Sequence, residues 1–185
     1  EKTVITNIND GFDFLGWNFR KFKGKLLIQP SRKSKQKVTK SLSRTIKYYH
    51  EANQELLIIK LNQITRGWAE YHHCACAKKT YALIDHRLWE MLWKWAKRRH
   101  PRKGKKWIKN RYWHPKGNRE WSFRTDKAIL YQMMDMPIVR IRSLDLKKNP
   151  FLDGEYFEHR RKQHKKDKET AYLSSTAALS GYYAL

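Results

Sequence analysis

The sequence predicts a mainly α-helical protein with a short N-terminal β-hairpin and a small, basic, aromatic-rich α+β region towards its C-terminal end. Three observations lead to this fold class. Apolar residues recur with the period of an α-helix in three successive stretches between residues 31 and 100. Apolar and polar residues alternate before residue 20, as they do in half-buried strands. After Pro101 the composition shifts to lysine, arginine and tryptophan, with turn signals between short apolar runs.

Two alternating runs open the chain, at residues 3–8 and 12–19, and the turn signal Asp10-Gly11 separates them. We interpret these runs as a pair of strands that continues to about Ile28. The first residue is a glutamate that stands directly inside a strand-like pattern. We therefore expect the chain to start inside a larger protein.

The three helical stretches carry recognisable start and stop signals. Ser31 can cap the first helix, whose apolar positions are Val38, Leu42, Ile46 and Tyr49. The second helix is predicted over residues 54–72 and the third over residues 78–99, each with one apolar stripe. The connections between them are short, so the sequence predicts a three-helix bundle.

The chain beyond residue 100 is expected to form a smaller domain with its own aromatic cluster. Residues 107–113 and 119–123 are predicted as two strands joined by a turn at 114–118, and residues 137–142 as another strand. Residues 156–168 predict a charged helix or tail, and no charged residue follows Glu169. The predicted regions are residues 1–30, 31–100, 101–168 and 169–185.

The charge of the chain points to a polyanionic partner. Lys and Arg number 41 against 17 Asp and Glu, which gives a formal net charge of +24. No run approaches the roughly 18 apolar residues of a membrane-spanning helix, and the first residues do not form a secretory signal. A membrane surface is the alternative polyanion, but we expect nucleic acid, and an intracellular protein that is not secreted.

The basic residues gather in two stretches without acids. Residues 19–50 hold eleven Lys and Arg, and residues 94–119 hold twelve. A solvated helix face normally mixes charges of both signs, because like charges four residues apart repel. Trp107, Tyr112 and Trp113 lie among the second set and could stack on bases, although packing in a core is an equally good interpretation of each ring.

Residues 72–76 are the one cluster with metal-ligand side chains, namely His72, His73, Cys74 and Cys76. Four ligands this close in sequence rarely form a tetrahedral zinc site, which usually needs two separated pairs. Polar residues at a helix end with half-buried thiols are the better interpretation. We find no phosphate-binding glycine loop, no nucleophile motif and no paired acids for two metal ions, so we predict neither a catalytic nor a metal-binding residue.

Three segments, in the same order, resemble group II intron reverse transcriptases, and together they cover about residues 1–165. The run from Gly11 to Trp17 is similar to the last strand motif before the thumb. Residues 61–72, Leu-Asn-Gln-Ile-Thr-Arg-Gly-Trp-Ala-Glu-Tyr-His, resemble the signature of the maturase or X domain. Asn149-Pro150-Phe151 resembles the usual C-terminal stretch. Gln63 and His73 depart from the family pattern, and residues beyond 169 match nothing in it.

The resemblance implies which domain each region of the chain would form. Residues 1–30 would be the end of the palm, residues 31–100 the thumb or maturase domain, and residues 101–168 a DNA-binding-like region. The family implies binding of group II intron RNA, and of template–primer or target DNA, in support of splicing and mobility. The polymerase aspartates would lie upstream in the fingers and palm, so Mg²⁺ is expected only there and in the intron RNA. The implied location is the bacterial cytoplasm or an organelle.

The predicted site residues form three sets. The proposed RNA contacts are Lys33, Lys35, Lys37, Lys40, Arg44 and Arg66. The proposed second nucleic-acid surface is Arg98, Arg99, Lys103, Lys105, Lys106, Lys109 and Arg111. The structural residues of the motifs are Gly16, Leu61, Gly67, Trp68 and Tyr71, with Gly67 and Trp68 expected to let helices pack closely. Two alternatives stay open: a stand-alone basic binding module, and a metal-dependent nuclease that uses residues 72–76.

Overall fold

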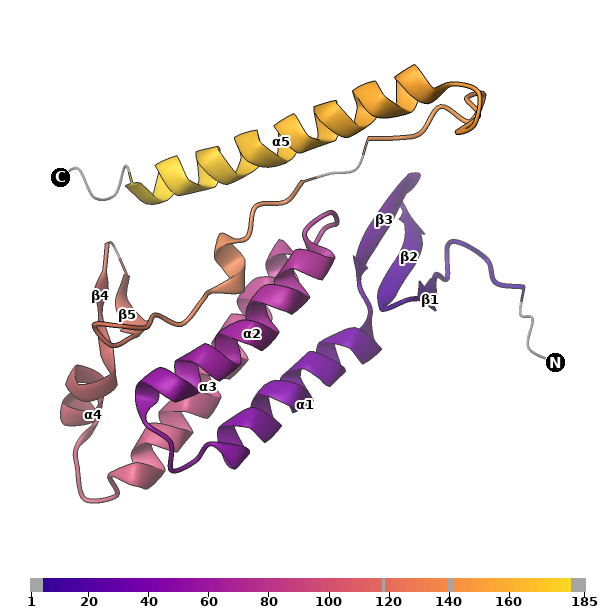
Figure 1. The fold of residues 1–185 in the computed structure, drawn as a ribbon. Coiled ribbons are helices and arrows are strands. Elements are labelled where there is room, and N and C mark those ends of the chain that lie inside the picture. The colour runs from indigo at the N-terminus through magenta and orange to yellow at the C-terminus, as the bar shows by residue number, and fades with distance from the viewer. Residues whose placement is uncertain (1–4, 118, 140–141, 181–185) are drawn as a thin grey trace.

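The computed structural model describes residues 5–117, 119–139 and 142–180, and side chains up to residue 173. Three long helices form its centre: α1 (Arg32–Tyr48), α2 (Gln54–His72) and α3 (Lys78–Arg99). They lie side by side as a bundle, with a small sheet at one end and a helix and hairpin near the other (Figure 1). The predicted mainly α fold with a three-helix bundle is confirmed.

Helix boundaries follow from their caps. The Ser31 backbone is extended, and its hydroxyl accepts a hydrogen bond from the Ser34 amide at 3.1 Å, which satisfies one free donor of the first turn. Asn53 caps α2 in the same way through the Leu56 amide at 2.8 Å. The last turn of α3 carries Lys97, Arg98 and Arg99 against the negative end of the helix dipole.

One hydrophobic core joins the bundle to the region after residue 100. Buried residues of α1, α2 and α3 pack in the same cluster as Ile108, Tyr112, Trp113, Phe123 and Met133. The prediction of a separate aromatic cluster in the second region is therefore wrong. Trp89 and Trp93 of α3 contact both Trp113 and Trp121, so the tryptophan cluster is built from both regions.

The N-terminal sheet has three antiparallel strands, β1 (Phe12–Phe14), β2 (Trp17–Phe22) and β3 (Lys25–Pro30), where a pair was predicted. Two-residue turns separate them, because Phe14 pairs with Trp17 and Phe22 with Lys25. Leu15, Gly16, Lys23 and Gly24 all have φ between 47° and 83°, as such tight hairpins require. Residues 5–8 form no strand, contrary to the prediction, and residues 3–4 lie outside the described part.

The segment after Pro101 differs from its prediction. Residues 107–112 belong to a helix, α4 (Lys105–Tyr112), rather than to a strand. The reason is the burial of Ile108 and Tyr112, which lie four residues apart on one helix face. The hairpin itself is present as β4 (Trp113–Lys116) and β5 (Arg119–Phe123). Residues 137–139 form no strand, and the remainder of that predicted strand lies partly outside the described residues.

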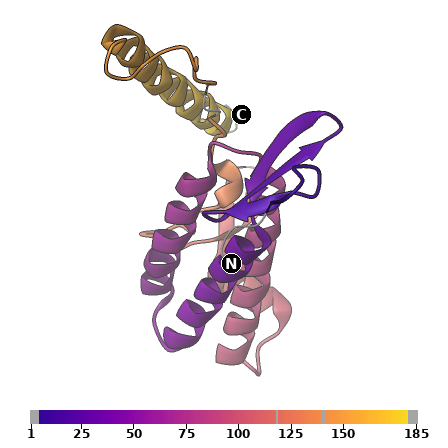
Figure 2. The same cartoon turned by 90° about the vertical axis from the view of Figure 1, so that its right-hand side faces the viewer.

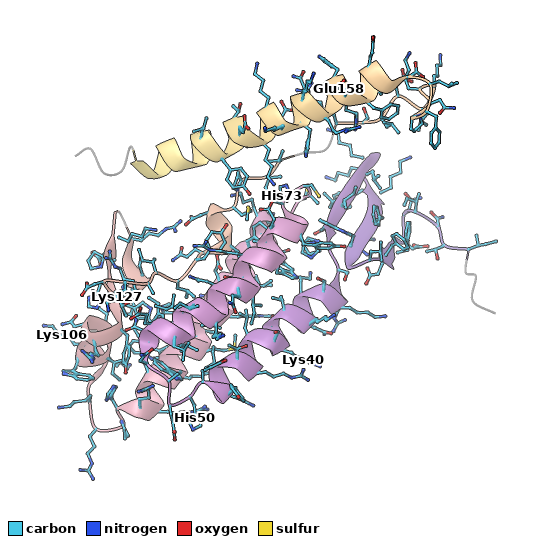
Figure 3. The ribbon with its side chains drawn as sticks, viewed as in Figure 1. Lys40, His50, His73, Lys106, Lys127 and Glu158 are labelled. Carbon is cyan, nitrogen blue, oxygen red and sulfur yellow. The ribbon has the colours of Figure 1, made fainter. Side chains whose placement is uncertain are left out.

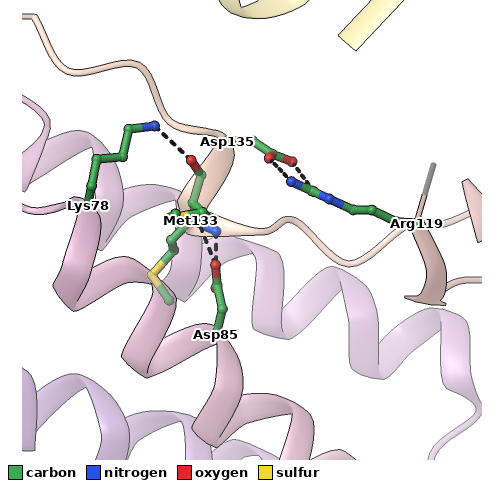
Figure 4. A network of polar contacts seen from close by, with 6 residues as sticks. Lys78, Asp85, Arg119, Met133 and Asp135 are labelled. Carbon is green, nitrogen blue, oxygen red and sulfur yellow. Dashed lines mark hydrogen bonds and ion pairs between the residues drawn. The ribbon is translucent and has the colours of Figure 1, made fainter. Parts of the chain in front are cut away.

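Polar contacts hold residues 133–135, the short 3₁₀ helix η1 (Met133–Asp135), against α3 (Figure 4). The Asp85 carboxylate accepts hydrogen bonds from the backbone amides of Met133 and Met134, at 3.1 and 2.9 Å. Lys78 donates to the Met134 carbonyl at 2.7 Å. Burial raises the pKa of Asp85 to about 6, against the opposing effect of these amides. The two amide hydrogen bonds thus stabilise the charged form of the half-buried Asp85 carboxylate.

The last helix, α5 (Gly154–Ser180), includes the predicted charged segment and continues into the uncharged one. It lies beyond the end of the bundle where α2 passes into α3, and the two views agree on this (Figures 1 and 2). Lys168 and Tyr172 hold it to Glu70 of α2, each at 2.7 Å. No helix among the described residues is long and apolar enough to cross a membrane.

Candidate nucleic-acid interface

Five exposed basic side chains form a row along α1. They are Lys33, Lys37, Lys40, Arg44 and Lys47. Steps of four and three residues place all five within about 40° of one direction on the helix. The buried residues Val38, Leu42 and Ile46 occupy the opposite face, and Lys40 accordingly lies on the side of α1 that faces away from α2 (Figure 3). We call these five residues the α1 cationic row.

The predicted RNA contacts divide between several places. Lys35 is half-buried and falls on the core side of α1, so it does not belong to the row. Lys47 belongs to the row although it was not predicted; its helical spacing from Lys40 and Arg44 was the available signal. Arg66 lies elsewhere, with its guanidinium 5.3 Å from the centre of the Tyr131 ring.

Arg66 belongs to a groove between α2 and the chain that follows β5. The groove has a volume of about 440 Å³, and Lys116, Arg119 and Lys127 also line it. Arg119 forms a bidentate ion pair with Asp135, at 2.8 and 2.6 Å. Arg66 therefore lines a basic groove that is separate from the α1 cationic row.

The predicted second surface surrounds the C-terminal end of α3 and α4. All its members are exposed except Lys109, which is half-buried. Arg99 is already engaged, because it donates to the carbonyls of His50 and Ala52 and lies 4.8 Å from the Trp95 ring centre. Arg99 thus fixes the loop between α1 and α2, while its neighbours Arg98, Lys103, Lys105, Lys106 and Arg111 extend to solvent.

The two basic surfaces meet at one end of the bundle. Lys47 and His50, at the end of α1, line a cavity of about 500 Å³ together with Arg98 and Arg99 of α3. The α1 cationic row therefore continues towards the end of α3. Figure 3 places His50 at this end and Lys106 further on, on α4.

The motif residues on α2 tie the bundle to its surroundings. Leu61 is fully buried in the core. The Tyr71 hydroxyl donates to the Leu15 carbonyl at 2.7 Å, and so supports the Leu15-Gly16 turn of the sheet. Asn62, which the sequence did not mark as structural, donates to the Ile129 carbonyl at 2.8 Å and accepts from the Tyr131 amide at 2.7 Å. The Asn62 side chain thus bonds the backbone of residues 129–131 as a neighbouring strand would.

Gly67 was predicted to let helices pack closely, and the structure differs from this. A β-carbon placed on Gly67 would meet no heavy atom of the surrounding structure within 4 Å. No helix packs closely against it, so the expectation of close packing is wrong at this position. Gly67 instead lines a cavity of about 720 Å³ between the N-terminal sheet, α1 and α2. We call this space the hairpin cavity.

His72 is the last residue of α2, as predicted for a helix-end residue, and its side chain is buried in the same region. Its ring lies 4.3 Å from that of Trp17 and 4.4 Å from that of Trp68, centre to centre. The Ser34 hydroxyl accepts from the Trp68 indole N–H at 3.1 Å and lies 3.1 Å from His72 Nε2. Burial lowers the pKa of His72 to about 4, so the ring is neutral near pH 7.

The two thiols near His72 differ in their burial. Cys74 is half-buried, and burial raises the pKa of its thiol, whereas Cys76 is exposed. Across the described ranges, no group of three or more His, Cys, Asp or Glu side chains lies close enough to hold a metal ion. The zinc-dependent alternative for residues 72–76 therefore gains no support.

Comparison with known families matches the helical bundle and α4. A family model of the group II intron maturase-specific domain matches residues 33–113. A comparison with curated proteins gave no match. The matched segment contains the α1 cationic row, the motif on α2, the basic end of α3 and all of α4. Residues 33–113 therefore match the maturase-specific domain of group II introns, which supports a maturase function for this part of the chain.

Proposed function

We propose that this maturase domain binds group II intron RNA through the α1 cationic row, and that the contact continues to the C-terminal end of α3. One observation carries the proposal. The seven basic residues of α1 are accompanied by no acidic residue, and none of the seven forms an ion pair within the described residues. The exposed positive charge of this helix face is thus unpaired within the described part of the chain.

The arrangement is unfavourable for an isolated helix. Like charges three or four residues apart destabilise a helix by about 0.2–0.5 kcal/mol per pair, and the row contains four successive pairs of this kind. Glutamates at alternate positions would remove this repulsion. A phosphate backbone removes it as well, because phosphates placed between the side chains convert repulsion into attraction.

The length of the row suits a polyanion rather than a single anion. From Lys33 to Lys47 the helix rises about 21 Å, at about 1.5 Å per residue. Such contacts with phosphates fix position and register without reading base sequence. A maturase that supports a folded intron would use this kind of contact, because RNA backbone geometry is what a folded intron presents to a protein surface.

The experiment replaces Lys37, Lys40 and Arg44 with alanine together. We expect weaker binding to a transcribed group II intron RNA, and a slope of log K against log salt that is smaller by about 2–3, since each lost phosphate contact removes about 0.7–0.9. The matched control replaces Arg161, Lys165 and Lys166 of α5, which are also exposed and remove the same charge. Equal slopes for the α1 variant and the unmodified chain would overturn the proposal.

The second surface extends the proposal to DNA. Trp107 and Trp121 are 40% and 42% exposed, and Lys103 and Lys109 lie over their rings at 5.5 and 5.3 Å. Exposed rings beside cations suit stacking on unpaired bases together with phosphate contacts. Binding of template–primer or target DNA by this surface follows the family resemblance. Titration of the same α1 and α5 variants with an RNA–DNA duplex, next to a Lys105, Lys106 and Arg111 alanine variant, separates the two surfaces.

A further inference from the structure

The hairpin cavity lies beside the α1 cationic row. Its walls come from three elements that are distant in sequence, the turn between β1 and β2, the first three turns of α1, and the second half of α2. The side chains that the argument uses are Asp13, Lys33, Lys37, Gly67, Trp68 and Tyr71. The cavity therefore opens where the row begins.

Gly67 keeps the cavity open at some expense to the helix. Glycine inside a helix is less favourable than alanine, because it loses more backbone freedom on folding. The usual compensation is close packing of another element against the glycine, and Gly67 has no neighbouring atom within 4 Å of a β-carbon position. What the glycine provides is empty space in the middle of a motif helix.

The cavity is lined by cations and by uncharged aromatic rings. Lys33 and Lys37 are exposed, and neither forms an ion pair within the part of the chain that the structure describes. Trp68 is half-buried and Tyr71 is 51% exposed, and both rings lie next to the neutral ring of His72. Exposed cations beside accessible aromatic rings match the two parts of a nucleotide, its phosphate and its base.

Asp13 completes the lining from the sheet side. One of its carboxylate oxygens accepts a hydrogen bond from the Asn18 side-chain amide at 2.8 Å. The second oxygen is available to accept from an exocyclic amino group of a base, which is the usual pairing of a carboxylate with a base edge. A carboxylate here would repel a second phosphate, so the cavity favours a base over another stretch of backbone.

We propose that the hairpin cavity takes up one unpaired nucleobase of the bound RNA, whose phosphates lie on Lys33 and Lys37. This inference rests on the proposed function, because the α1 cationic row is what brings the backbone to the mouth of the cavity. It adds a contact that distinguishes RNA with a bulged or looped nucleotide from a continuous duplex.

The experiment fills the cavity without removing any existing contact. Gly67→Leu places a side chain in the empty space, and Gln63→Leu places the same side chain on the same helix at an exposed position outside the cavity. Binding is measured with two RNAs of equal length, a hairpin with one bulged nucleotide and a continuous duplex. We expect Gly67→Leu to weaken binding of the bulged RNA about ten-fold, the usual scale for one stacked base, with an unchanged salt slope. Binding of the duplex, and of both RNAs by Gln63→Leu, should stay as in the unmodified chain.

Two further measurements make the result decisive. Gly67→Ala should raise the melting temperature, because alanine favours the helix, and should weaken binding of the bulged RNA less than leucine does. A 2-aminopurine at the bulge should change its fluorescence on binding to the unmodified chain and not to Gly67→Leu. Unchanged affinity of Gly67→Leu for the bulged RNA, or an equal loss for both RNAs, would overturn the inference. If either outcome occurs while the α1 alanine variant still shows a reduced salt slope, the inference about the cavity fails and the proposed RNA binding by the α1 cationic row stands.

Discussion

Helices α1 and α5 are both rich in basic residues, but they differ in whether those residues are paired with acidic ones. α1 carries seven Lys and Arg and no acid, whereas α5 carries six Lys and Arg and four acids. In α5, Lys162 pairs with Glu158 at 3.3 Å, Lys168 with Glu70 at 2.7 Å, and Asp167 with Arg142 at 2.8 Å. The basic residues of α1 have no such pairs within the described ranges.

The two helices also differ in how they are held. α1 buries Val38, Leu42 and Ile46 in the core, while none of the α5 side chains described is buried. A helix with a firm apolar anchor can leave its other face unpaired and available for a partner. Among the described residues, α5 packs on the core only through the partly buried Tyr172, so it depends more on its polar and charged contacts for its position. Net charge alone therefore does not identify a binding surface; the pairing of that charge does.

The largest difference between these helices should appear in the stability of the fold. Leu42→Ala in α1 removes a fully buried side chain and should lower the free energy of unfolding by about 2–5 kcal/mol. Leu173→Ala in α5, at a side chain that is 70% exposed, should change it by no more than about 0.5 kcal/mol. Denaturant unfolding followed by circular dichroism measures both. Similar losses in the two variants would mean that α5 is anchored as firmly as α1.

A smaller and more local effect is expected at Glu70, which holds α5 on the bundle. The hydrogen bond from Lys168 lowers the pKa of Glu70, with a further contribution from Tyr172, and this outweighs the opposing effect of burial. A lowered acid pKa gives stability that is present above the unfolded pKa of about 4.5 and is lost as the pH falls through the folded value. Acidification below that range should therefore release α5 before the bundle unfolds.

Glu70→Gln should have the same effect at neutral pH. We expect backbone amides of α5 to exchange faster with deuterium, with a loss of global stability of about 1 kcal/mol or less, because the pair is partly exposed. Glu169→Gln, the same change at an exposed position of α5, serves as the control. Unaltered exchange in α5 of the Glu70 variant would show that other contacts hold this helix.

The sequence was informative wherever a local signal had one physical meaning. Residues 54–72 and 78–99 were predicted as helices with the bounds that the structure has, because their apolar period is long and Pro101 follows the second of them. Residues 107–112 were mistaken for a strand. The turn signal at residues 114–118 suggested a strand on either side of it, while the buried pair Ile108 and Tyr112 has the spacing of a helix.

The candidate site was less predictable, because it depends on direction and on space. Basic clustering selected Lys35, which faces the core side, and omitted Lys47, which completes the row; counting helical angles from the buried positions would have corrected both. Gly67 could not be interpreted in the same way. A helical glycine can allow close packing of another element or can line an open cavity, and the residue type alone does not distinguish the two; at Gly67 the space is open.

The last expected effect on stability concerns the repulsion within the α1 cationic row. Lys40→Glu turns two repulsive neighbours, Lys37 and Arg44, into attractive ones, so the free energy of unfolding should rise by up to about 1 kcal/mol. Lys40→Gln only removes the repulsion and should give about half of that gain. Both changes should weaken RNA binding, the glutamate more than the glutamine. Thermal melting at low and at high salt checks the electrostatic origin, because added salt screens these pairs and should shrink the gain. A variant that is more stable but binds RNA less well would show that the unpaired charge of α1 serves binding of a partner and does not stabilise the fold. The charged contacts of α5, by contrast, hold that helix in place. Loss of stability in Lys40→Glu would instead mean that Lys40 makes a favourable contact within the protein, as Lys168 does in α5.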